Sequence, residues 1–219
     1  MIMTASEAIL LEKYAIWTAG KVALAAVILL IFTFATWIVI RKSKTVQEKT
    51  DKKSKKITTA VLLAVAATLG ALMFLRFGMA TEVIKGMILI MILLYAGISD
   101  VAKREVPDFV APMILILSFV CFAPASLPSM ILGAAAVFIP QLFIAILKPN
   151  RGIGGADIKI TTALGFMLGA EKGIAAMLIG MLLAVIITAI AKKVRKESMK
   201  DAFALLPFLS IGAIAAYMI

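Results

Sequence analysis

The chain has 219 residues, of which 63% are apolar and 16% charged, and its 23 Lys and Arg against 12 Asp and Glu give a net charge of +11. A mean hydropathy of +1.09 excludes the soluble globular class. The absence of histidine excludes Ser-His-Asp triads, Cys-His dyads and His-ligated zinc sites, and a single cysteine, Cys121, excludes a disulfide within the chain.

Apolar runs bounded by charged residues occur eight times along the chain. A bilayer core of about 30 Å needs about 20 apolar residues per helix, so we expect an all-α polytopic membrane protein with about eight transmembrane helices. The first run is too long for a signal-peptide core and ends at Arg41 without a small-residue cleavage site, which indicates a retained anchor. The predicted segments are 20–40, 57–75, 83–99, 109–124, 129–147, 153–170, 173–191 and 202–219.

Lys and Arg are distributed unequally between the two sides of this arrangement. One side carries 18 of the 23, and eight of those lie in segment 41–56. Because basic residues near span ends favour the cytoplasm, this bias predicts that both termini lie outside. Segment 41–56 is then a cytoplasmic loop near anionic lipid head groups, and no aromatic residues interleave with its lysines as nucleic-acid binding would require.

Four acidic residues fall at the cytoplasmic ends of the later spans. Asp100 ends one apolar run and Asp157 begins another, while Glu105 and Asp108 follow Asp100. A carboxylate at the bilayer centre costs about 2.5–3.5 kcal/mol, so acids close to a span indicate function. Two close carboxylates do not readily both ionise, and such a pair, with one proton donor and one base, is the catalytic device that this composition still permits.

Helix direction suggests which carboxylate is the base. Asp100 lies at a helix C-terminus, where the dipole opposes a negative charge, and Asp157 lies near a helix N-terminus, where the dipole favours one. Our hypothesis is that Asp157 is the base and Asp100 the proton donor. The alternative is structural: a helix-end ion pair with Lys103, Arg104 or Lys159, or N-capping by Asp157.

Prolines and small residues inside the spans have predicted structural roles. Pro140, beside Gln141, and Pro207 interrupt apolar runs and should kink their helices. Pro140 and Gln141 are assigned to helix packing. One helix face is expected to pack closely through its small residues, which are Thr161, Thr162, Gly165 and Gly169.

Two segments together resemble motifs of the type IV prepilin peptidases. Asp100-Val-Ala-Lys-Arg104-Glu-Val106-Pro107-Asp108 resembles their D-x-x-x-R-x-[IV]-P-[ND] segment, and Gly154-Gly-Ala-Asp157-Ile-Lys159 resembles their G-x-G-D-x-K segment. The last run, with Leu206-Pro207-Phe208-Leu209, is similar to the family's proline-containing last helix. The resemblance covers about residues 83–219.

The resemblance implies that Asp100 and Asp157 are the catalytic aspartates of a GxGD-type membrane aspartyl protease that needs no metal or other cofactor. It implies a six-helix catalytic core at 83–219. The apolar and charged runs before it predict a transmembrane anchor with its basic loop at 1–56 and an accessory helix with an outer loop at 57–82. The supporting motif residues are Arg104, Pro107, Asp108, Gly154, Gly155, Ala156, Lys159 and Pro207.

The implied substrates are prepilin, pseudopilin or archaellin precursors in the membrane. Each carries a short basic leader ahead of an apolar helix and would be cut at the cytoplasmic end of that helix. Glu105 and Asp108 would attract the basic leader. The alternative among enzymes is a presenilin-like protease that cuts inside transmembrane helices. From another class, the alternative is a transporter or assembly partner in which the acids form a proton relay or helix-end ion pairs.

The sequence departs from the family pattern in three places. Ala156 replaces the second glycine of GxGD, and its methyl group would narrow the cleft or alter the approach of a substrate strand. Asp108 stands where asparagine is common. Segment 41–56 contains no cysteine, whereas bifunctional bacterial members carry a cytoplasmic domain there, often with CxxC pairs, that is linked to N-methylation. We therefore predict a peptidase without methyltransferase activity and without zinc.

Overall fold

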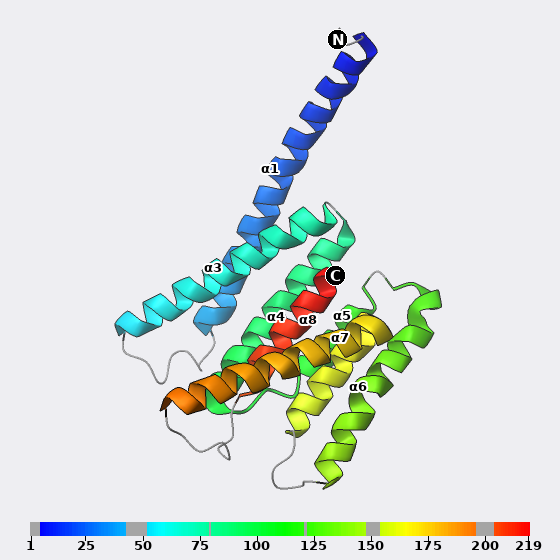
Figure 1. The fold of residues 1–219 in the computed structure, drawn as a ribbon. Helices are drawn as coiled ribbons and strands as arrows, with labels where there is room; N and C mark the ends of the chain where they lie inside the picture. Colours follow the sequence, from blue (N-terminus) through cyan, green and yellow to red (C-terminus); the bar gives the residue numbers. More distant parts are fainter. Residues whose placement is uncertain (1–4, 43–51, 79, 121, 148–153, 196–203) are drawn as a thin grey trace.

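The computed structural model describes all residues except 1–4, 43–51, 79, 121, 148–153 and 196–203 (Figure 1). Cys121 and most of the basic segment 41–56 therefore lie outside the described residues. The described part is helical and contains no strand. Its elements are α1 (Ala5–Lys42), α3 (Lys52–Phe77), α4 (Thr81–Lys103), α5 (Val110–Ser118), the 3-10 turn η1 (Pro124–Ser126), α6 (Leu127–Leu147), α7 (Gly155–Arg195) and α8 (Leu206–Met218).

The length and apolarity of these helices confirm the predicted all-α polytopic membrane protein. Within the described residues, α1, α3, α4, α6 and α7 are long and apolar enough to cross a membrane, and α8 is a shorter apolar helix. Many large apolar side chains on these helices are exposed, as expected for surfaces that face lipid. Each of the eight predicted apolar runs corresponds to a helix or to one arm of α7.

Helix α7 contains two of the predicted runs, joined at a bend. At Gly169 the backbone has φ 80° and ψ −179°, a conformation that glycine adopts without the clash a Cβ atom would cause. The arm before Gly169 and the arm after it run in different directions from the bend (yellow and orange in Figure 1). The predicted boundary between segments 153–170 and 173–191 thus falls at this glycine.

Two predicted elements differ from the structure. Segment 109–124 was expected to be a span, but α5 has nine residues and ends at Ser118, whose carbonyl oxygen accepts a hydrogen bond from Lys85 Nζ at 3.2 Å. Pro207 does not interrupt the last helix; it lies in the first turn of α8. A proline there costs no helical hydrogen bond, because the first N–H groups of a helix have no partner inside it.

Close packing of α6 on α7 depends on residues without large side chains. A methyl group at Gly133 of α6 would overlap the carbonyl oxygen of Gly165 in α7. Further along, Thr161 Oγ1 donates to Gln141 Oε1 at 2.9 Å, and both side chains are buried. The predicted close-packing face is confirmed at Gly165, and Gln141, next to Pro140 inside α6, contacts α7 as expected.

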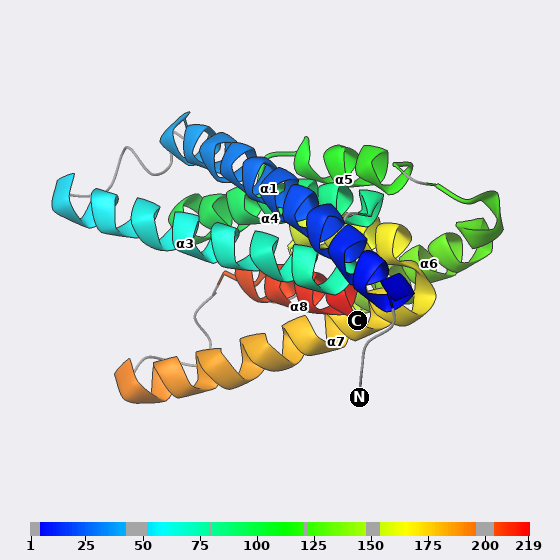
Figure 2. The ribbon, with the colours of Figure 1, turned by 90° about the horizontal axis from the view of Figure 1, so that it is seen from above.

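Helix α8 lies between α4 and the second arm of α7 (Figure 2). A methyl group at Gly212 would overlap the carbonyl oxygen of Ala176, so α8 approaches α7 at backbone distance.

The C-terminal end of α8 is held by α3 and α4. Arg76 of α3 donates to the carbonyl oxygens of Met218 at 2.8 Å and Ile219 at 3.1 Å, and Tyr217 Oη donates to the carbonyl oxygen of Glu82 at 2.8 Å. The helix before the predicted core therefore contacts the last helix directly.

The contact between α6 and α7 gives a stability prediction. We expect Gly133→Ala to lower the free energy of unfolding by about 1–3 kcal/mol, because the added methyl group meets backbone that only a helix shift can move. Gly155→Ala is the matched control, since a methyl group there meets no atom within 4 Å. Denaturant unfolding in detergent measures both, and equal stabilities for the two variants would contradict the packing described.

Candidate active site

Asp100 lies in the last turn of α4 and is 8% exposed. Its Oδ2 accepts a hydrogen bond from the backbone N–H of Leu206, the first residue of α8, at 3.0 Å. One turn earlier, Gly97 faces Pro207, whose Cα would lie 3.7 Å from a methyl group at that glycine. The small residue at position 97 therefore lets the start of α8 come close to the end of α4.

The chain turns sharply directly after Asp100. Arg104 adopts a left-handed conformation, with φ 55° and ψ 28°, and its N–H donates to the Asp100 carbonyl oxygen at 2.8 Å, which closes α4. Ser99 Oγ donates to the carbonyl oxygen of Glu105 at 2.8 Å. These bonds fold residues 104–109 back against α4, so that Pro107 and Asp108 lie at the same end of the molecule as Asp100.

Asp157 is the third residue of α7. Its carboxylate accepts a hydrogen bond from the backbone N–H of Gly154, and a methyl group at Gly154 would lie 3.3 Å from Asp157 Oδ2. An acid at this position that bonds back to the residue before the helix is the second half of a capping box. The structural alternative, in which Asp157 is itself the N-cap, does not hold as stated: Asp157 is the third helical residue and bonds back to the residue before the helix, and it is half-buried.

The structure brings the two aspartates near each other from different helices. The Asp100 carboxylate is close enough for its charge to act on Asp157. Burial and mutual repulsion both oppose a doubly ionised pair. The sequence predicted Asp100 and Asp157 at one depth, and the structure adds that the charge of Asp100 acts on Asp157 across two different helices.

Lys159 and Asp108 join the two motif segments by an ion pair. Lys159 Nζ lies 3.0 Å from Asp108 Oδ1, and the two side chains are 64% and 87% exposed. The pair connects residues 51 positions apart in the sequence. Because Asp108 already has a cationic partner, its charge is less available to attract a basic peptide than the sequence suggested.

The remaining motif residues surround this arrangement. Gly155 is exposed with open space at its Cβ position, whereas Ala156 is half-buried. Pro107 is half-buried beside α4, and Pro207 packs at Gly97. Across the ranges that the structure describes, no three His, Cys, Asp or Glu residues are grouped to hold a metal ion.

Two features of the site were not found from the sequence. The Leu206 N–H is a partner of Asp100, and its signal was the proline at position 207, which marks a helix start. The dipole argument also considered only the helix that carries each aspartate. Because Asp100 Oδ2 meets the N-terminus of α8, both carboxylates lie at a helix N-terminus, and helix direction no longer identifies the base.

Comparison with known proteins agrees with the two motifs. The type IV leader peptidase family matches residues 87–189, a region that contains both Asp100 and Asp157. A prepilin leader peptidase/N-methyltransferase of Bacillus subtilis (strain 168) is 29% identical over 169 residues, which is 74% of this chain and 63% of that protein. No solved structure matches the chain significantly. The resemblance to the type IV prepilin peptidases is confirmed, and the chain spans about 63% of the length of this curated relative.

The exposed ion pair gives a second prediction. In a double-mutant cycle with Asp108→Asn and Lys159→Gln, we expect a coupling free energy of at most about 1 kcal/mol, because water and salt screen exposed charges. Unfolding in detergent at low and high salt measures this coupling. A coupling well above that value, unchanged by salt, would show that the pair is a main support of the site.

Proposed function

We propose that the chain is a membrane aspartyl endopeptidase that removes the basic leader of type IV prepilin-like or archaellin precursors at the cytoplasmic membrane face. The observation that carries the proposal is that Asp100 of α4 and Asp157 of α7 lie within electrostatic reach of each other, inside the region that matches the type IV leader peptidase family. Paired carboxylates are sufficient for hydrolysis of a peptide bond, so no histidine, cysteine or metal ion is required.

The reaction divides between the two carboxyl groups. The ionised aspartate removes a proton from water as the water oxygen bonds to the peptide carbonyl carbon, and the protonated aspartate donates its proton to the carbonyl oxygen. The C–N bond then breaks: the leaving nitrogen takes the proton held by the first aspartate, and a hydroxyl of the intermediate returns a proton to the second. The pair ends in its starting protonation state.

Backbone amides support this chemistry by orienting the carboxylates. The Leu206 N–H fixes Asp100, and the Gly154 N–H fixes Asp157, each from a helix N-terminus. Such fixed donors stabilise negative charge without reorganising during the reaction. Both carboxylates also avoid a direct ion pair with Lys159, which contacts Asp108 instead.

The proposal assigns leader cleavage without N-methylation. The name of the Bacillus subtilis relative includes an N-methyltransferase, and this chain spans only part of that protein. Segment 41–56 is rich in lysine and has no cysteine. It therefore lacks the thiol ligands of the CxxC-containing domain that the family resemblance links to methylation.

The first test of the proposal is cleavage in membranes. A precursor with a basic leader should be processed by the wild type, while Asp100→Ala and Asp157→Ala should each abolish processing, because neither carboxyl can serve as both acid and base. The exposed acid Glu171 on α7 supplies the control, and Glu171→Ala should cut normally. Product bands are measured at matched membrane levels of each protein.

Other outcomes of this experiment identify the alternatives. Cleavage inside the apolar helix of the precursor would indicate a presenilin-like protease. Proton-coupled uptake into vesicles that is lost in both aspartate variants, without any proteolysis, would favour a transporter. Processing that survives in either aspartate variant would exclude the dyad.

A separate prediction concerns the new N-terminus of the product. We expect the mature peptide to carry an unmodified amine when purified enzyme, precursor and S-adenosylmethionine are incubated together, since the sequence offers no paired cysteines for a metal-stabilised methyltransferase domain. Mass spectrometry of the product measures this. A gain of 14 Da, about one methylene, in the presence of the methyl donor would overturn the assignment.

A further inference from the structure

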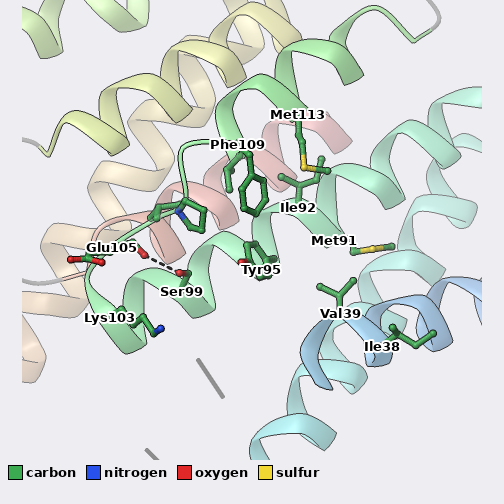
Figure 3. A pocket seen from close by; sticks show the side chains of 13 residues that line it. Ile38, Val39, Met91, Ile92, Tyr95, Ser99, Lys103, Glu105, Phe109 and Met113 are labelled. Atoms are coloured by element: carbon green, nitrogen blue, oxygen red, sulfur yellow. Dashed lines mark hydrogen bonds between the residues drawn. The ribbon is translucent and has the colours of Figure 1, made fainter. Parts of the chain in front are cut away.

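A groove of about 760 Å³ opens where α1, α4 and the segment after α4 meet (Figure 3). One wall comes from Val39 of α1, near the end of that helix, and the opposite wall comes from Tyr95 of α4 with Phe109 and Met113. The ring centroids of Tyr95 and Phe109 lie 5.8 Å apart, and both rings line the groove. Phe109 and Met113 remain 49% and 43% exposed, so the groove presents large apolar side chains without covering them.

The residues that line the groove change from apolar to polar and charged along α4. Met91 and Ile92 line one part, and Ser99, Lys103 and Glu105 line the other. At 1.5 Å per residue of helix, Met91 and Lys103 are about 18 Å apart along α4. The groove therefore leads from an apolar part of α4 to a charged end beside Asp100.

The charged end of the groove is built from the same residues as the candidate active site. Ser99 precedes Asp100 and bonds to the Glu105 carbonyl oxygen. Pro107 lines the groove, and the next residue, Asp108, pairs with Lys159 near Asp157. Residues 104–109 thus form a wall of the groove and at the same time connect to both aspartates.

Resting on the proposed function, we propose that this groove binds the apolar helix of the precursor, with the side chain of Glu105 next to the basic leader. The chemistry of the two partners matches along their length: the apolar walls meet the apolar helix, and an exposed carboxylate meets the cationic leader that precedes this helix in the precursor. Lys103 already has an interaction partner within the protein. An anionic lipid head group is the poorer occupant, because Glu105 would repel it.

Binding in the groove fixes the position of the scissile bond. A helix seated against Tyr95 and Met113 ends near Ser99, and the extended residues that join it to the leader continue across residues 104–109. An extended peptide covers about 3.3 Å per residue, so a few residues suffice to pass this segment. The groove therefore sets how far from the apolar helix the enzyme cuts.

The test fills the groove with a larger side chain. Met113→Trp should raise the KM for the precursor about tenfold or more with kcat nearly unchanged, because it obstructs binding without touching the reacting groups. Ile116→Trp is the matched control on the same helix, since Ile116 is 71% exposed and lies outside the groove. A KM in Met113→Trp equal to that of the control would overturn the proposal.

A separate experiment tests the role of Glu105 at the charged end of the groove. Glu105→Lys should raise the KM for a precursor with a lysine-rich leader several-fold, and much less for the same precursor with a neutral leader. Glu82→Lys, an exposed acid at the start of α4, should leave both KM values unchanged. An equal effect of Glu105→Lys on both leaders would contradict the predicted contact.

Photo-crosslinking identifies the occupant even if a tryptophan variant does not fold. A photoreactive residue at position 113 of the Asp157→Ala variant should form an adduct with the apolar segment of the precursor, and the same residue at position 116 should form adducts with lipid. Lipid adducts alone at position 113, in the presence of excess precursor, would refute the groove as the binding site. If the wild type cuts no precursor, the proposed function fails, whereas cutting with an unaltered KM in Met113→Trp refutes the groove alone.

Discussion

The hydrogen bond from the Leu206 amide to Asp100 connects the last helix to the functional end of α4. A carboxylate at a helix end within a membrane protein is stable only if its surroundings replace water, and here an N–H at the N-terminus of α8 does so. The bond requires the start of α8 to lie against α4. Gly97 permits this approach because no side chain separates α4 from Pro207. The position of Asp100 therefore depends on the packing of a helix more than a hundred residues later.

The position of Asp157 also depends on close helix packing. Gly212 brings α8 to backbone distance from the second arm of α7, and Gly133 and Gly165 do the same for α6 and the first arm. Between these contacts α7 bends at Gly169, so both arms pack while the first arm still places Asp157 near Asp100. Without an aqueous driving force between membrane helices, van der Waals contact of this kind is what holds such helices together.

The sequence predicted the features that depend on local composition and missed those that depend on long-range contact. Apolar runs must match the bilayer, so the helical segments and the end positions of Asp100 and Asp157 were correct. The length of α5 was not, because its end is determined in part by Lys85, which reaches the Ser118 carbonyl from α4. Pro207 was predicted to kink the last helix, although proline is also common in the first turn of a helix. The partner of Asp100 is a backbone amide, which every residue but proline offers; Pro207 marks the helix start that presents it, but not the distant carboxylate that it meets.

The contact between Arg76 and the end of α8 links α3 mechanically to the surroundings of Asp100. Helix α8 has thirteen residues and is about 20 Å long, with Arg76 bound at one end and Asp100 at the other. Because a short helix is rigid, a shift of its C-terminal end along the helix axis also moves its N-terminal end. The two ends of α8 are therefore mechanically coupled. A displacement of α3 would thereby also displace the helix end whose N–H group orients the Asp100 carboxylate.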